Sequence, residues 1–277
     1  MTDRDASAAH PGKRWRRFLL VLLLAGAAAC APRVLQLPTG DGQAFPDYQQ
    51  AMQEATSACR GVRTMSAELV ISGLVGREKL RGRVTAGLAA PGSIRLEGTA
   101  PFGPPVFILV AGGAKATLLL PRDNRVLTGE PPAAILQALV GLELDPGDLL
   151  AILAGCVVPD PQAIGGRTYS NGWARIDLAS GATAYLQRDR QERWGLRAAV
   201  RAPLRIEYDR MPGSMPTAVR LQVTGEPGTG TDLRIGVSQV ETNVPLAAEV
   251  FALRLPADSV PISLAALRQS WPMGERR

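Results

Sequence analysis

The feature of this sequence that most constrains its fold is a series of short alternating segments joined by very short links. Apolar residues alternate with other residues in Met65–Ile71, in Leu80–Leu88 and in Ile94–Thr99. Such alternation predicts β-strands that bury one face. Links of a few residues cannot form the crossover that a parallel pair needs, so consecutive strands are expected to pair antiparallel.

The same pattern continues along most of the chain. Further strands are predicted at Val106–Val110, Ala116–Leu120, near Val126, and at Trp173–Leu178, Thr183–Arg188, Leu196–Val200, Leu204–Tyr208, Val219–Val223, Leu233–Val240 and Phe251–Leu253. A sheet of about a dozen short strands curls, and one apolar face becomes a concave interior. We therefore expect a mainly β fold with a few α-helices, built as an antiparallel, strongly curved, unclosed half-barrel.

Two short and very apolar segments in the middle of the chain change to the helical period. One lies between Pro131 and Gly141 and the other between Pro146 and Gly155. A proline near the start and a glycine after the end are typical of helices. These two helices either plug an ordinary core or form a lid over a hydrophobic cavity. A further short helix is predicted at Leu264–Gln269.

A helix that includes Cys59 is also predicted before the first strand. From Pro46, apolar residues recur every three or four positions as far as Cys59, and Gly61 ends the pattern. Cys59 and Cys156 could pair in an oxidising periplasm. Nothing in the sequence brings them together, so two unpaired, buried thiols are the favoured interpretation.

The N-terminus has the organisation of a bacterial lipoprotein signal peptide. A basic segment, Lys13–Arg17, precedes the apolar run Phe18–Ala25. Small residues and then Cys30 follow, and the apolar run is short for a membrane span. We predict that residues 1–29 are removed and that Cys30 is lipidated. An ordinary secreted protein and a retained signal anchor are the alternatives.

The rest of the chain divides by composition. Residues 30–45 are rich in Pro, Gly and polar residues and are expected to form a flexible tether. The β domain is expected to occupy residues 46–256, and residues 257–277 form a C-terminal tail with the possible short helix. Ala31 after the lipidated cysteine, where Asp would signal retention by the enterobacterial sorting rule, favours the periplasmic face of the outer membrane.

Several classes of function are disfavoured. The only histidine, His10, would be removed with the signal, which excludes histidine-dependent triads and histidine-ligated zinc. Residues 1–29 carry half of the net charge of +6, and the other charges are interspersed, so nucleic acid is not an expected partner. No nucleophile elbow or phosphate loop occurs. We expect no enzyme, cofactor or metal. An esterase with a Ser nucleophile and a non-His base is the enzymatic alternative.

Three carboxylates have simple structural interpretations. Asp145 and Asp148 flank the start of the second middle helix, where a carboxylate can cap the helix and interact favourably with its dipole. Glu97 lies on a predicted strand and is interpreted as part of a solvated face.

A stiff turn interrupts the pattern between Ile94–Thr99 and the next strand. Three prolines and a glycine occur within residues 101–105, and such a segment can neither join a sheet ladder nor hold a helix. The turn would carry Phe102 at its tip. Either Phe102 folds back and covers the core, or it is a probe for lipid.

Several elements stand in a characteristic order along the chain. Cys30 precedes an amphipathic helix and a strand that begins Met65-Ser-Ala-Glu-Leu. The stretch Arg95-Leu-Glu-Gly-Thr-Ala-Pro-Phe-Gly comes next, followed by the helical segment Gly141–Gly155 and the closing stretch Phe251–Pro256. In this order they resemble the LolB family of outer-membrane lipoprotein receptors.

The resemblance implies an unclosed half-barrel with a helical lid over a hydrophobic cavity that takes acyl chains. It places Phe102 at a membrane-insertion tip, flanked by Pro101 and Gly103. The partners it implies are acyl chains of lipoproteins or lipids, a soluble periplasmic lipoprotein carrier, and the membrane itself through the lipid anchor. Residues expected in the cavity are Leu69, Ile71, Ile94, Leu96, Ile108, Leu150, Ile176, Leu186, Leu204, Ile206 and Val219.

The function expected from these features is non-covalent. A lipidated, periplasm-facing protein would bind acyl chains and help to insert them into the outer membrane. The alternative is a non-catalytic scaffold or sensor subunit of an envelope complex, with its cavity filled by its own side chains.

Overall fold

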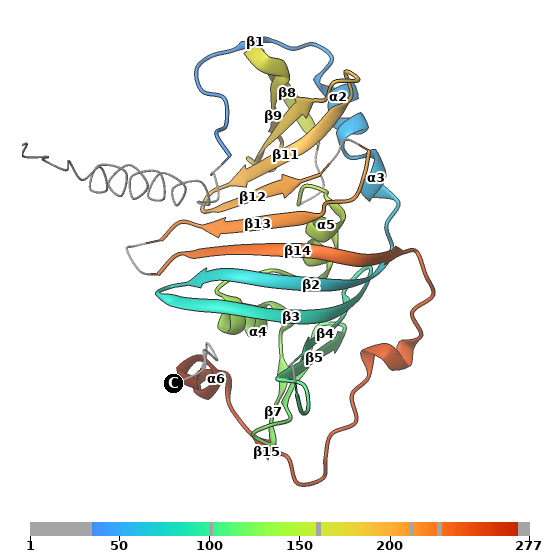
Figure 1. Cartoon of the computed structure of the whole chain (residues 1–277), viewed down its shortest axis with the longest axis vertical. Helices are drawn as coiled ribbons and strands as arrows, with labels where there is room; N and C mark the ends of the chain where they lie inside the picture. Colours follow the sequence, from blue (N-terminus) through green and yellow to red (C-terminus); the bar gives the residue numbers. More distant parts are fainter. Residues whose placement is uncertain (1–34, 100–101, 159–161, 211–212, 226–228, 271–277) are drawn as a thin grey trace, which may run out of the picture. The chain divides into compact units, whose positions relative to one another are not determined.

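A computed structural model describes residues 35–99, 102–158, 162–210, 213–225 and 229–270 of the chain. The unit that begins at Pro38 is described by itself. Within the described residues it contains one sheet of 15 strands, with the order β1-β8-β9-β10-β11-β12-β13-β14-β2-β3-β4-β5-β6-β7-β15 (Figure 1). The strands are β1 (Gln43–Ala44), β2 (Thr64–Val75), β3 (Glu78–Ala89), β4 (Ser93–Thr99), β5 (Phe107–Gly112), β6 (Ala116–Leu120), β7 (Arg125–Glu130), β8 (Ala163–Tyr169), β9 (Trp173–Leu178), β10 (Thr183–Arg188), β11 (Trp194–Arg201), β12 (Leu204–Asp209), β13 (Ala218–Val223), β14 (Thr231–Thr242) and β15 (Val260–Pro261).

Two antiparallel meanders make up this sheet. Strands β2–β7 form one and β8–β14 form the other, and β14 pairs with β2 to join them, with Ile235 opposite Ile71. Every pair is antiparallel except β15 with β7, which is parallel. Since β1 and β15 are the two ends of the strand order, the sheet does not close on itself. The predicted antiparallel, unclosed, mainly β fold is therefore confirmed.

The helices are α2 (Tyr48–Ala55), α3 (Ser57–Arg60), α4 (Pro132–Val140), α5 (Pro146–Ala154) and α6 (Leu264–Ser270), and the 3-10 helices are η2 (Ser170–Gly172) and η3 (Ala248–Phe251). Helices α4 and α5 come between the two meanders and cover one face of the sheet, which we call the inner face (Figure 1). The other face is the outer face. None of the helices in the described part of the chain is long and apolar enough to cross a bilayer.

Strand alternation gives the two faces different chemistry. On β9 and β10, Ile176 and Leu186 are fully buried, while their neighbours Arg175 and Tyr185 are only partly buried. The same alternation on β2 buries Leu69 and exposes Val70. The apolar inner face and the helices on it therefore form the core.

Strand β8 was not predicted, and its sequence explains why. It reads AIGGRTY, in which two glycines interrupt the alternation, and none of its residues is fully buried. A Cβ atom at Gly166 would clash with the Cβ of Tyr48 at the start of α2. The glycine is thus required for close helix–strand packing, which a single sequence does not show.

The predicted strand at Phe251–Leu253 is wrong. This segment belongs to the long connection between β14 and β15, which includes η3 (Figure 1). The guanidinium of Arg95 on β4 donates to the carbonyl oxygens of Val250 (3.2 Å) and Ala252 (3.5 Å). A side chain, instead of a neighbouring strand, satisfies these backbone groups.

The favoured interpretation of two free thiols is also wrong. Cys59 on α3 and Cys156 just after α5 form a disulfide, with 5.6 Å between their Cα atoms. The bridge spans 97 residues of sequence. The contact of α3 with α5 brings the two cysteines together, and that contact depends on tertiary packing that no local pattern indicates.

Candidate functional site

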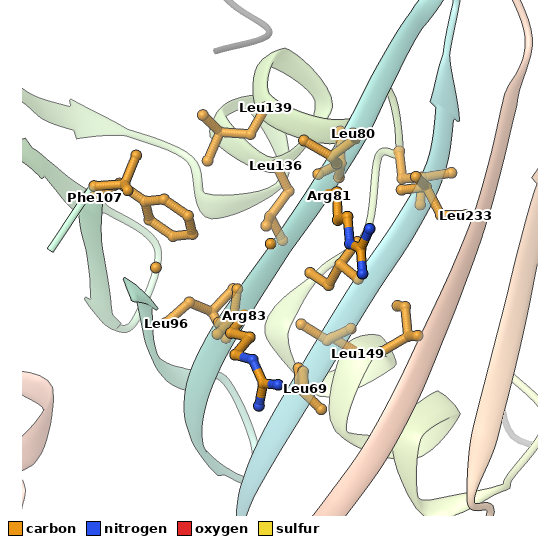
Figure 2. A pocket seen from close by; sticks show the side chains of 18 of the residues that line it. Leu69, Leu80, Arg81, Arg83, Leu96, Phe107, Leu136, Leu139, Leu149 and Leu233 are labelled. Atoms are coloured by element: carbon orange, nitrogen blue, oxygen red, sulfur yellow. The ribbon is translucent and has the colours of Figure 1, made fainter. Parts of the chain in front are cut away.

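A hydrophobic cavity of about 190 Å³ lies between the inner face of the sheet and helix α4 (Figure 2). Strands β2, β3, β4, β13 and β14 contribute to its wall, and so does the segment that joins α4 to α5. Its lining comprises Leu69, Ile71, Leu80, Arg81, Gly82, Arg83, Val84, Leu96, Gly98, Thr99, Val106, Phe107, Leu136, Leu139, Val140, Leu142, Leu144, Leu149, Leu221, Leu233 and Ile235.

Two glycines shape this space in different ways. Gly82 alternates with Leu80 and Val84 on the inner face of β3, and a Cβ atom there would meet nothing within 4 Å. Gly98 on β4 is different, because a Cβ there would lie 2.5 Å from the ring of Phe107. The Phe107 ring therefore lies over Gly98 and forms part of the wall. Gly82 leaves an empty position where a larger residue would enter the hollow.

Helix α4 is the roof of the cavity, and its C-terminus is fixed to β14. The helix ends at Gly141, which has a left-handed φ of 69° and donates from its backbone N–H to the carbonyl of Gln137 (2.9 Å). The Thr231 hydroxyl donates to the carbonyl of Val140 (3.4 Å). A Cβ at Gly141 would lie 2.5 Å from that hydroxyl oxygen, so both conformation and space require glycine here.

The mouth of the cavity lies where β3 and β4 separate. The described part of β4 ends at Thr99, opposite Arg83, so residues 78–82 of β3 have no partner on that side within the described residues. Thr99 and Phe107, at the ends of β4 and β5, both line the cavity. The loop that carries Phe102 connects these two strand ends.

Phe102 does not fold back onto the core, because 90% of its surface is exposed. The neighbouring Gly103 has a φ of +83°, which favours glycine. Arg122, in the turn after β6, donates to the carbonyl oxygens of Phe102 (3.2 Å) and Pro104 (3.4 Å). These bonds tie the loop to the sheet and hold an apolar side chain in solvent. Pro101 lies outside the described residues.

The structure separates the expected cavity residues into groups. Leu69, Ile71 and Leu96 line the cavity. A second group is buried in the core without lining it: Ile94, Leu150, Ile176, Leu186, Ile206 and Val219. Leu204 packs against the core at its edge. Ile108 lies on the outer face, because the register places it opposite Glu97 while its neighbour Leu109 faces the core.

The cavity-lining side chains of α4 were not among the predicted site residues. Leu136 and Leu139 belong to a helix that was predicted as a lid or a plug, but the sequence did not indicate which side chains face a space. Gly82 and Gly98 carried a usable signal, since each occupies an apolar position in an alternating strand. A missing side chain at such a position indicates a gap or a close approach.

The acidic residues near the roof do not form the expected cap. Asp145 is the N-cap residue of α5, yet its side chain makes no capping hydrogen bond. Burial raises the pKa of Asp148 above its usual value, and the charge of Asp145 raises it further, while Arg201 opposes the shift. Glu97 forms a partly buried ion pair with Arg95 (3.3 Å). No group of three or more potential metal ligands occurs among the described residues.

Comparison with known proteins identifies the fold alone. No family model and no curated protein matches this sequence. A LolA superfamily protein from Nitrosomonas europaea superposes with a TM-score of 0.50 at 11% identity, over 74% of this chain and 97% of that chain. A DUF1329 family protein from Desulfovibrio piger gives a TM-score of 0.44 at 12% identity, over 75% and 98% of the two chains. A domain named for outer membrane lipoprotein sorting, from Vibrio parahaemolyticus, gives 0.40 at 10% identity, over 73% and 97%. The first of these has the same fold as the present chain.

Proposed function

We propose that this protein binds an acyl chain of a lipoprotein or lipid in the cavity and delivers it to the outer membrane without covalent chemistry. One observation carries the proposal: an apolar hollow opens beside a loop that holds Phe102 in solvent. The LolB-like order of motifs and the LolA-like fold support the same function. The protein would act at the periplasmic face of the outer membrane, anchored through Cys30, which lies outside the described residues.

The size of the hollow supports a single chain. An engineered cavity of about 150 Å³ with a similar lining stays dry and binds benzene, and the present one measures about 190 Å³. Part of one hydrocarbon chain fits such a space without rearrangement. A complete chain requires α4 to move away from the sheet, and Thr231 holds the C-terminal end of that helix.

Phe102 would reach the hydrocarbon region of the bilayer during delivery. Burying its side chain in lipid contributes about 1.5–3 kcal/mol, which is too little to anchor a protein. Together with the acyl chains on Cys30 it supplies a second membrane signal, and stable binding commonly needs two. The loop would thereby hold the cavity mouth at the membrane.

The proposal is tested by filling the hollow. We expect Gly82→Leu to abolish binding of a fluorescent fatty acid, because the new side chain enters the space that Gly82 leaves open. Thr85→Leu is the matched control, since Thr85 lies on the same strand but is exposed on the outer face. If the Gly82 variant binds like the wild type while both variants remain folded, the cavity is not the acyl site.

A second experiment separates this function from a scaffold or sensor role. Mass spectrometry of gently purified protein is expected to detect co-purified lipid. A protein that emerges without lipid, and that binds no fatty acid, would favour the scaffold. The Phe102→Glu variant then tests the tip, with the prediction that fatty acid is still bound but transfer to liposomes is lost.

A further inference from the structure

Two arginines at the mouth of the cavity have no ion-pair partner within the described residues. Arg81 and Arg83 lie on β3 among the residues around the hollow, and both are exposed (Figure 2). No carboxylate of the described chain forms a salt bridge with either of them. Glu68 on β2 lies opposite Thr85, two residues along β3 from Arg83, and Glu68 forms no salt bridge with Arg83.

The strand register explains how these side chains reach the mouth. Residues 79, 81 and 83 point to the outer face, while Leu80, Gly82 and Val84 point inward. Because the described part of β4 ends opposite Arg83, residues 78–82 of β3 have no partner strand on that side among the described residues. Long side chains at this edge therefore border the opening as well as the outer face. Both arginines are among the residues that line the hollow (Figure 2).

We propose that Arg81 and Arg83 select an anionic lipid as the cargo, with its phosphate on the two guanidinium groups and its acyl chain in the hollow. Arginine binds phosphate oxygens with charge-assisted, often bidentate hydrogen bonds. An apolar space with a few cationic groups at its entrance matches an amphiphile of that kind. This inference rests on the proposed function in one respect, namely that an acyl chain occupies the cavity.

The geometry favours an anionic phospholipid over an acylated protein. A lipidated N-terminal cysteine carries several acyl chains and no phosphate, so it offers nothing for the two arginines. The hollow of about 190 Å³ accepts part of one chain. A lipid with one acyl chain and a net negative head group satisfies both features.

The experiment compares two single-chain phospholipids, one with a net negative head group and one with a zwitterionic head group. Calorimetry would measure binding of lysophosphatidylglycerol and lysophosphatidylcholine with the same acyl chain, below their micellar concentrations, to delipidated protein. We expect the anionic lipid to bind about tenfold more tightly, which corresponds to about 1.4 kcal/mol. The double variant Arg81→Gln/Arg83→Gln should lose that preference and bind the two lipids with equal affinity.

A matched control removes the same charge elsewhere on the hairpin. Arg77 and Lys79 lie near the same edge but do not line the cavity. The Arg77→Gln/Lys79→Gln variant should therefore retain the tenfold preference. Equal loss in both variants, or equal binding of the two lipids by the wild type, overturns the head-group assignment while leaving acyl binding intact. A wild-type protein that binds neither lipid refutes the proposed function itself.

Discussion

Two parts of the sheet use the same alternation but produce different interiors. In strands β8–β11, which α2 covers and which we call the filled half, Ile176 and Leu186 are fully buried. The hollow lies over β2, β3 and β4 and over the adjoining strands β13 and β14, which we call the hollow half. Helix α2 packs closely against β8 and β11, whereas α4 covers its strands less completely.

The comparison shows that alternation determines the face of the sheet on which a side chain lies. It does not determine whether the space above that face is filled. Gly166 in the filled half permits close approach of α2, since a Cβ there would clash with Tyr48. Gly82 in the hollow half meets nothing within 4 Å. The same residue type thus closes one interior and opens the other, according to where the helix above it lies.

The largest expected effect on stability is in the filled half. We expect Leu186→Ala to cost about 2–5 kcal/mol of unfolding free energy, because it leaves a new cavity in a close-packed core. Leu80 is only partly buried and already borders the hollow. Leu80→Ala should therefore cost much less, as measured by urea denaturation. Similar losses for both variants would mean that the two interiors are equally packed.

The next effect concerns the link between the halves. The disulfide joins α3, which follows α2 of the filled half, to the end of α5, which contacts β3 and β4. The Cys59→Ser/Cys156→Ser variant should lose about 2–4 kcal/mol. Adding a reductant should destabilise the wild type by a similar amount and leave the variant unchanged. If the reductant has no effect on unfolding of the wild type, the bridge contributes nothing to stability.

The sequence predicted the strands well and the interiors poorly, for a physical reason. Period-two alternation is a local property, so Trp173–Leu178 and Thr183–Arg188 were predicted with the bounds that the structure has. The hollow depends on the distance between α4 and β3, which is a tertiary property. The disulfide and the close approach at Gly166 depend on helix positions in the same way. The outward position of Ile108 follows from register, which the proline-rich turn before it obscured.

A smaller effect concerns the roof of the hollow half. Gly141→Ala should cost about 1–2 kcal/mol, since a Cβ is unfavourable in the left-handed region and would also press against Thr231. We expect the helix end to shift and fatty-acid binding to change along with stability. Gly181→Ala is the control, because Gly181 also has a positive φ (77°) but has open space around it, in the filled half. That variant should lose stability and leave fatty-acid binding unchanged.

The smallest effect is a pH dependence at the start of α5. Because burial and Asp145 raise the pKa of Asp148 in the folded state, the folded protein binds a proton there more tightly than the unfolded chain does. The associated stability is therefore present below the usual pKa of an aspartate and is lost as the pH rises towards the raised folded value. Asp148→Asn, which stays neutral, should be slightly more stable than the wild type at pH 7, and the difference should shrink towards pH 4.

Urea denaturation across this pH range measures the difference in stability, with the exposed Asp123→Asn as control. A variant that is less stable at pH 7 would show that the Asp148 charge instead serves the dipole of α5, since an anion in the first turn is favourable there.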